Sequence, residues 1–135
     1  MSAASNFLEN AVLNHVLTAS SYTAPTTRYL ALFKNTSGNA ATNLEAGTLT
    51  DEISGGTYAR KAVTFAAASG GTSASNATVT FDTATANWGT ITHIAVMDAL
   101  TSGNVLFWGA VTTPKTIETG DTFQVSSGNL TISLA

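Results

Sequence analysis

The chain has 135 residues, a length that fits a single domain, and Asp, Glu, Lys and Arg make up only 10% of it, against about 25% in a typical protein. It has no cysteine, which excludes disulfides and thiol chemistry. With 5 Lys and Arg against 8 Asp and Glu, it lacks the clustered cations on which nucleic-acid binding depends. The sequence shows neither a secretory leader nor an apolar run of the ~20 residues that span a bilayer. We therefore expect synthesis in the cytoplasm and no membrane partner.

Residues 6–18 predict the only helix, because apolar side chains recur there at helical spacing. These side chains are Phe7, Leu8, Ala11, Val12, Val16 and Leu17. Asn6 and Glu9 predict a capping box at the start of the helix, and Pro25 prevents its continuation. A helix this short is marginal alone. We therefore expect it to dock, either on its own domain or on a neighbouring subunit.

Beyond Pro25 the sequence predicts seven or eight short strands separated by turn residues. The predicted strands cover residues 28–34, 57–66, 77–82, 90–98, 104–111, 115–119, 122–126 and 129–134. The stretches 35–57 and 69–76, rich in small polar residues, predict loops. We expect an all-β fold, an antiparallel β-sandwich or a jelly-roll-like barrel, with one short N-terminal helix. The expected organisation is a helical docking arm at 1–20 and a single β-sandwich domain at 21–135.

The predicted sheets have little protection at their edges. Sheet proteins usually block edge pairing with lysines, prolines or inward charges, and this chain has few of either residue type: Lys34, Lys61, Lys115, Pro25 and Pro114. Either the sheet closes on itself or partners cover its edges. We favour assembly with partners.

Residue types that carry catalysis are sparse and scattered. His15 lies in the predicted helix and His93 in a predicted strand, and neither has the spacing of a metal-ligand motif. The acids lie at strand ends or in loops, where such side chains commonly cap turns. We therefore expect a non-enzymatic protein with no catalytic, cofactor-binding or metal site. Trp88 and Trp108 are expected in the core, the alternative being an exposed contact to a sugar or a protein.

Three short motifs are the most specific parts of the sequence. They are Gly-Gly-x-Tyr-Ala-Arg at 55–60, Trp-Gly-Thr-Ile-Thr-His at 88–93 and Trp-Gly-Ala at 108–110. Together with NFLENAVLNHVL at 6–17, they make nearly the whole chain resemble a family of small bacteriophage virion structural proteins, labelled head decoration or tail fibre proteins. Residues 94–97 lack the aromatic side chain common in relatives but stay apolar. The resemblance implies a virion component and carries no catalytic residues.

Among virion functions we expect capsid cement or decoration, because a protein that binds only the assembled shell stabilises that shell. The expected partners are the major capsid protein or other virion proteins, together with further copies of the chain, a trimer being favoured. The residues expected to dock on these partners are Phe7, Leu8, Val12, Val16, Glu45, Asp51 and Glu52.

The alternative is a tail fibre or adhesin component that contacts the host surface. In that case exposed aromatic side chains such as Tyr22, Tyr58 or a tryptophan would stack on sugars. A free carbohydrate-binding module or small enzyme is disfavoured, because the sequence shows neither a secretory leader nor a constellation of catalytic groups.

Overall fold

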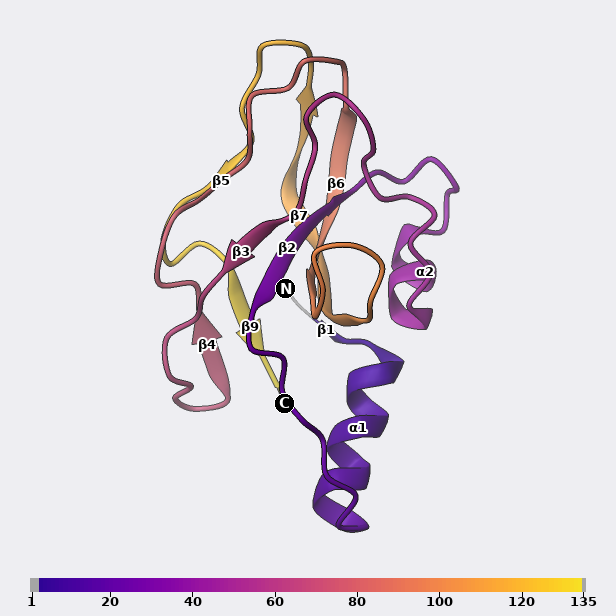
Figure 1. The fold of residues 1–135 in the computed structure, drawn as a ribbon, viewed down its shortest axis with the longest axis vertical. Coiled ribbons are helices and arrows are strands. Elements are labelled where there is room, and N and C mark those ends of the chain that lie inside the picture. Colours follow the sequence, from indigo (N-terminus) through magenta and orange to yellow (C-terminus); the bar gives the residue numbers. More distant parts are fainter. Residues whose placement is uncertain (1–2, 135) are drawn as a thin grey trace.

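The computed structural model describes residues 3–134, which form nine strands and two helices. In chain order these are β1 Ala3–Ala4, α1 Asn6–Leu17, β2 Arg28–Phe33, α2 Ala40–Ala46, β3 Lys61–Val63, β4 Thr72–Ala74, β5 Val79–Thr80, β6 Gly89–Met97, β7 Val105–Ile117, β8 Gln124–Val125 and β9 Thr131–Ser133. A five-stranded antiparallel sheet has the order β1-β7-β6-β2-β3, and two small sheets pair β4 with β9 and β5 with β8 (Figure 1).

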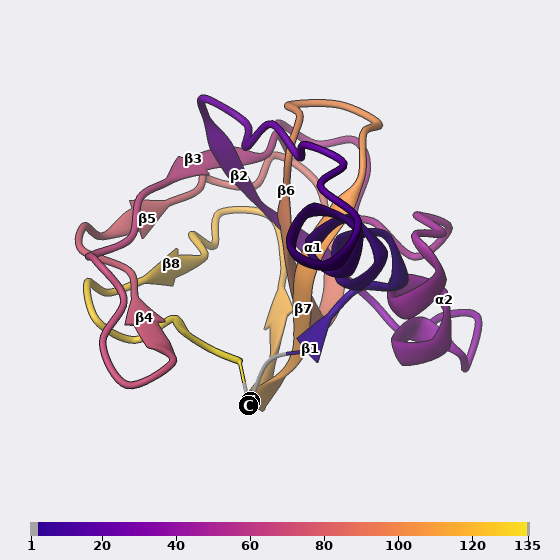
Figure 2. The same ribbon diagram turned by 90° about the horizontal axis from the view of Figure 1, so that it is seen from below.

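The elements are arranged as an open sandwich, which confirms the predicted antiparallel all-β fold. Figure 2 shows the small sheets curving around one side of the β2–β6–β7 sheet, while α2, with α1 beside it, lies on the other side. One large apolar cluster fills the space between the sheets, and a second lies under α2. The layers therefore give the β6–β7 hairpin two covered faces, and the sheets do not close into a barrel.

The β6–β7 hairpin is the centre of the fold. The predicted strands 104–111 and 115–119 are one strand, β7, which pairs with β6 from Val105 to Ile117. Pro114 was expected to start a new strand. It lies instead in an irregularity where Ile91 pairs with Lys115 but His93 pairs with Ala110. The residues in this bulge have no partner on β6, so a proline without an N–H costs no ladder hydrogen bond there.

The N-cap of α1 lies one residue earlier than predicted. Ser5, not Asn6, is the N-cap, and its Oγ accepts a hydrogen bond from the N–H of Leu8 at 3.3 Å. The Ser5 hydroxyl also donates to the carbonyl of Val105, and its N–H donates to Leu106 O at 2.9 Å. The predicted Asn6–Glu9 capping box is therefore wrong, because Asn6 already lies inside the helix.

Two stretches predicted as loops contain regular structure. Residues 35–57 include α2, whose first N–H is bonded by the Asn35 side chain at 2.9 Å and whose last turn ends at Gly47 with a left-handed φ of 80°. Leu44 anchors α2 in the second cluster. Residues 69–76 include β4. Both elements are held by tertiary packing and pairing, and small polar residues give them no periodic pattern.

Candidate assembly surface

The structure places the four predicted docking residues of α1 in different environments. Leu8 is buried against the body of the protein, whereas Phe7 and Val12 are 39% exposed and Val16 is 69% exposed. Leu8 is the only buried residue of the helix. Phe7 packs edge-on against Tyr22 of the following segment. Most of α1 therefore offers its apolar side chains to solvent, and the helix projects beyond the sheets (Figure 1).

The three predicted docking acids are bonded within the chain. The Glu45 carboxylate accepts the Trp108 indole N–H at 2.8 Å. Asp51 is buried and accepts both the N–H and the hydroxyl of Ser37. These bonds to Ser37 are the main reason that the pKa of Asp51 lies below its ordinary value. Glu52 pairs with Arg60. A docking function for these acids stays a prediction, and each has an internal function in the fold.

The Gly-Gly-x-Tyr-Ala-Arg motif forms a buried polar cluster. Arg60 is 4% exposed and makes a two-fold contact with Glu52, Nε to Oε1 and Nη2 to Oε2, both at 2.7 Å. The Tyr58 hydroxyl donates to Glu52 at 2.9 Å and accepts the N–H of Leu32 at 3.1 Å. Burial, with the nearby Glu52 charge adding to it, raises the pKa of Tyr58 far above its ordinary value.

The same motif fastens two loops to the sheet. The Nη1 of Arg60 donates to the carbonyls of Ala99 and Ser102, each at 2.8 Å, in the β6–β7 turn. The carbonyl of Gly56 accepts the indole N–H of Trp88 at 2.9 Å. The most specific motif of the sequence is thus structural.

Two of the aromatic side chains named for the adhesin alternative, Tyr58 and Trp88, pack inside the fold. Trp88 is 2% exposed, and Tyr58 stacks on Phe81 and packs edge-on against Trp88. Stacking of Tyr58 or Trp88 on a sugar is therefore excluded by their packing. Trp108 is half-buried and packs on the cluster under α2.

Neither histidine lies in a group of metal-binding side chains. Within residues 3–134, no three His, Asp and Glu side chains gather to hold a metal ion. His15 accepts the N–H of Tyr22 at 3.1 Å, and His93 lies beside Trp108. Burial lowers the pKa of His93. No helix within the described residues is long and apolar enough to cross a bilayer.

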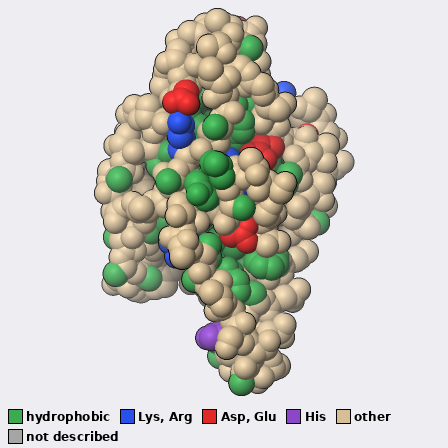
Figure 3. All heavy atoms as spheres, viewed as in Figure 1, with side chains coloured by type: hydrophobic (Ala, Val, Ile, Leu, Met, Phe, Trp, Pro, Cys, Tyr) green, Lys and Arg blue, Asp and Glu red, His purple; other side chains and the backbone are tan. Residues whose placement is uncertain are grey.

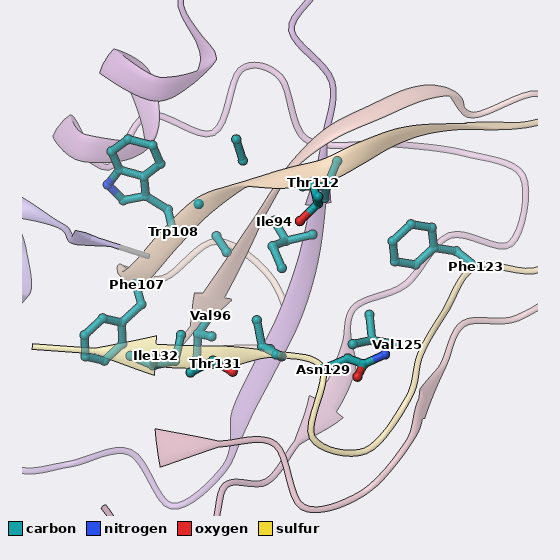
Figure 4. Close-up of a pocket in the computed structure, with 15 residues that line it drawn as sticks. Ile94, Val96, Phe107, Trp108, Thr112, Phe123, Val125, Asn129, Thr131 and Ile132 are labelled. Carbon is teal, nitrogen blue, oxygen red and sulfur yellow. The ribbon is translucent and has the colours of Figure 1, made fainter. Parts of the chain in front are cut away.

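An apolar groove opens between the β6–β7 hairpin and the C-terminal segment. Its larger part has a volume of about 280 Å³, and an adjoining part beside β4 has about 260 Å³. Val96, Phe107 and Ile132 line both parts and lie together in Figure 4. Sequence reasoning missed this groove, because it forms between segments distant in the chain. The alternation in 129–134 was its only signal: Leu130 is buried and Ile132 half-buried, whereas Leu134 is 57% exposed.

The polar residues that reach the surface are mostly uncharged. Figure 3 shows only a few charged side chains on the face of Figure 1, set among small polar and apolar groups. Such a surface has little long-range electrostatic field, and its contacts with neighbours depend on shape and apolar burial.

Comparison with known families gives the class of the protein. A family model described as "Podophage GP4 fiber I protein gp80" matches residues 3–133. The chain is therefore a bacteriophage virion structural protein of the fibre type. It belongs to the Gp80 family, which confirms the resemblance to small virion proteins. No curated protein matches the chain.

Proposed function

We propose that this protein is a non-enzymatic structural component of a phage tail fibre. The observation that carries the proposal is the match of the fibre family over residues 3–133. The match favours the tail-fibre alternative over the capsid cement or decoration function that we expected first. A fibre component must pack stably against other virion proteins.

The use of its polar groups supports a packing function. Glu45, Asp51, Glu52 and Arg60 are each bonded within the chain. The groove has apolar walls, and apart from Arg28 the polar side chains among its lining, such as Asn129 and Thr131, are amides and hydroxyls. The surfaces offered to neighbours are thus apolar or neutral, which suits close packing of protein against protein.

The packing of Tyr58 and Trp88 inside the fold supports a position in the body of the fibre rather than at its receptor-binding tip. Sugar-binding surfaces rely on exposed aromatic rings, and these two rings stabilise the core instead. We expect host polysaccharide to leave the purified protein unbound.

Two measurements on purified particles test the proposal. Quantitative mass spectrometry gives the copy number of this chain relative to the major capsid protein, and gold-labelled antibodies raised against the chain show where it lies by electron microscopy. We expect few copies per particle and label on the tail. A copy number close to that of the capsid protein, with label over the head, would establish capsid decoration instead.

A further inference from the structure

The helix α1 has an outward apolar face that residues 3–134 leave uncovered. Val12, Leu13, Val16 and Leu17 are spaced at i, i+1, i+4 and i+5, so they share one side of the helix. Their exposed fractions rise along it from 39% at Val12 to 54%, 69% and 74%. An isolated helix of 12 residues is marginal in water. The outer turns of α1 therefore gain stability from any surface that covers them.

The groove is a second apolar surface of the same chain without a cover in the described residues. Ile94, Phe107, Val125 and Ile132 are half-buried hydrophobic side chains that pack on the main core yet line the groove. In Figure 4 the labelled Ile94, Val96, Phe107 and Ile132 converge from β6, β7 and β9, while Trp108 points to the other side of β7. The groove is thus lined by side chains from β6, β7 and β9.

We propose that the outward face of α1 of one copy inserts into the groove of a second copy. Amphipathic helices bind apolar grooves through side chains one turn apart, and α1 provides two such pairs, Val12 with Val16 and Leu13 with Leu17. The helix of 12 residues is about 18 Å long. It spans several residues of the β7 and β9 segments that form the groove.

Buried area favours this arrangement over pairing of two α1 helices. A stable interface buries about 800 Å² on each partner. The largest apolar patch of an ordinary monomer, about 300–600 Å², falls short of that area. A helix lying in a groove is contacted on its sides as well, so the groove walls supply the missing area.

The charges on the two surfaces are complementary. Glu9 precedes the outward apolar face of α1 by one turn and is its only acidic side chain. Arg28 is the only charged residue among those that line either part of the groove, whose lining contains no carboxylate. Insertion therefore brings a negative helix to a groove whose single charge is positive, which favours this orientation.

The contact uses a different surface on each partner, so each pair of copies retains one free helix and one free groove. Such head-to-tail contacts close into rings or continue as filaments. This self-association goes beyond the proposed function, and its test on purified protein does not depend on where the protein lies in the particle.

Engineered cysteines test the contact, because the natural chain has none. One variant carries Val16→Cys on α1, a second carries Ile132→Cys in the groove, and a control carries Thr101→Cys in the exposed β6–β7 turn. Each purified variant is treated with a short bis-maleimide alone and in pairwise mixtures. We expect Val16→Cys and Ile132→Cys to form a cross-linked dimer when mixed and neither to do so alone.

Other cross-linking patterns would overturn the proposal. A dimer of Val16→Cys alone would mean that α1 helices pair with each other. Equal products with Thr101→Cys would mean random collision. The absence of any product from the mixture, with all variants folded by circular dichroism, would mean that the groove does not receive α1.

Sedimentation of otherwise natural protein gives an independent measurement. Val16→Asp places a charge on the outward face, and Asn14→Asp adds the same charge to the same helix at an exposed polar position. We expect Val16→Asp to need at least a tenfold higher concentration for association and Asn14→Asp to associate like the natural chain. Equal behaviour of the two variants, or a natural chain that stays monomeric at all concentrations, would refute the contact.

Discussion

The guanidinium of Arg60 and the carboxylate of Glu52 form a buried pair, with two parallel contacts of 2.7 Å. The side chains are only 3% and 17% exposed. Both belong to a network that also holds Tyr58 and the β6–β7 turn. The pair joins the segment after α2 to the centre of the sheet, so its loss affects several elements at once.

Replacing Arg60 by alanine should destabilise the protein by about 3 kcal/mol or more, because Glu52 would keep its buried charge without a cation. The matched control is Lys61→Ala. Lys61 contacts Asp82 at 3.0 Å with side chains 29% and 60% exposed, so its loss should cost no more than about 1 kcal/mol. Urea unfolding measures both. Similar losses for the two variants would contradict the importance of the buried pair.

Gly56→Ala should destabilise the protein more than Gly55→Ala does. Both glycines have left-handed φ angles, 79° at Gly55 and 54° at Gly56, so both variants carry a backbone strain of about 1–2 kcal/mol. A Cβ at Gly55 would meet nothing within 4 Å, whereas at Gly56 it would lie 2.7 Å from the Ala86 Cβ. Overpacking should add about 1–3 kcal/mol at Gly56. Thermal unfolding that ranks them the other way would refute this close contact.

Ser5→Ala should weaken the start of α1, with a loss of about 0.5–2 kcal/mol in stability. The variant removes the hydroxyl that accepts a hydrogen bond from the N–H of Leu8 and donates one to the carbonyl of Val105. Asn6→Ala is the control, since Asn6 lies within the helix and should change stability little. Chemical unfolding monitored by far-UV circular dichroism separates them. A larger effect at Asn6 would restore the capping box predicted from the sequence.

Asp51 should make the free energy of unfolding depend on pH in the acid range. Its hydrogen bonds from Ser37 hold its pKa in the folded protein below the ordinary 3.8. Ionised Asp51 therefore stabilises the fold above pH 3.8, and this contribution is lost as the pH falls through the folded-state pKa. Asp51→Asn should lower stability at neutral pH and flatten its decline in acid. Thr36→Ala, an exposed neighbour, should keep the natural profile in urea titrations at several pH values.

The sequence predicted those elements whose side chains repeat with a clear period. Residues 6–18 and 28–34 correspond to α1 and β2, and 90–98 with 104–111 gave the hairpin of β6 with the first part of β7. In β2, β6 and the first part of β7 apolar side chains meet the core directly, and in α1 Leu8 does so. Their positions follow from local pattern alone.

What the sequence missed depends on contacts between distant residues. The helix α2 exists because Leu44 is buried under it and Asn35 bonds its first turn. The sequence predicted Asp51 and Glu52 as docking residues at the surface. In the structure Asp51 is hydrogen-bonded by Ser37, and Glu52 pairs with Arg60. No local period reports such partners, and the same holds for the groove between β7 and β9.

The pairing of β1 with β7 has a consequence for how the protein is made. Ala3 and Ala4 lie opposite Trp108 and Phe107, and Ser5 bonds to Val105, 100 residues away in the chain. During synthesis, β7 must leave the ribosome before β1 can pair with it and Ser5 can bond to Val105. We therefore expect the outward face of α1 to be positioned only after β7 has left the ribosome. Neighbouring nascent chains on one messenger RNA then have little opportunity to join through α1 before β7 has emerged.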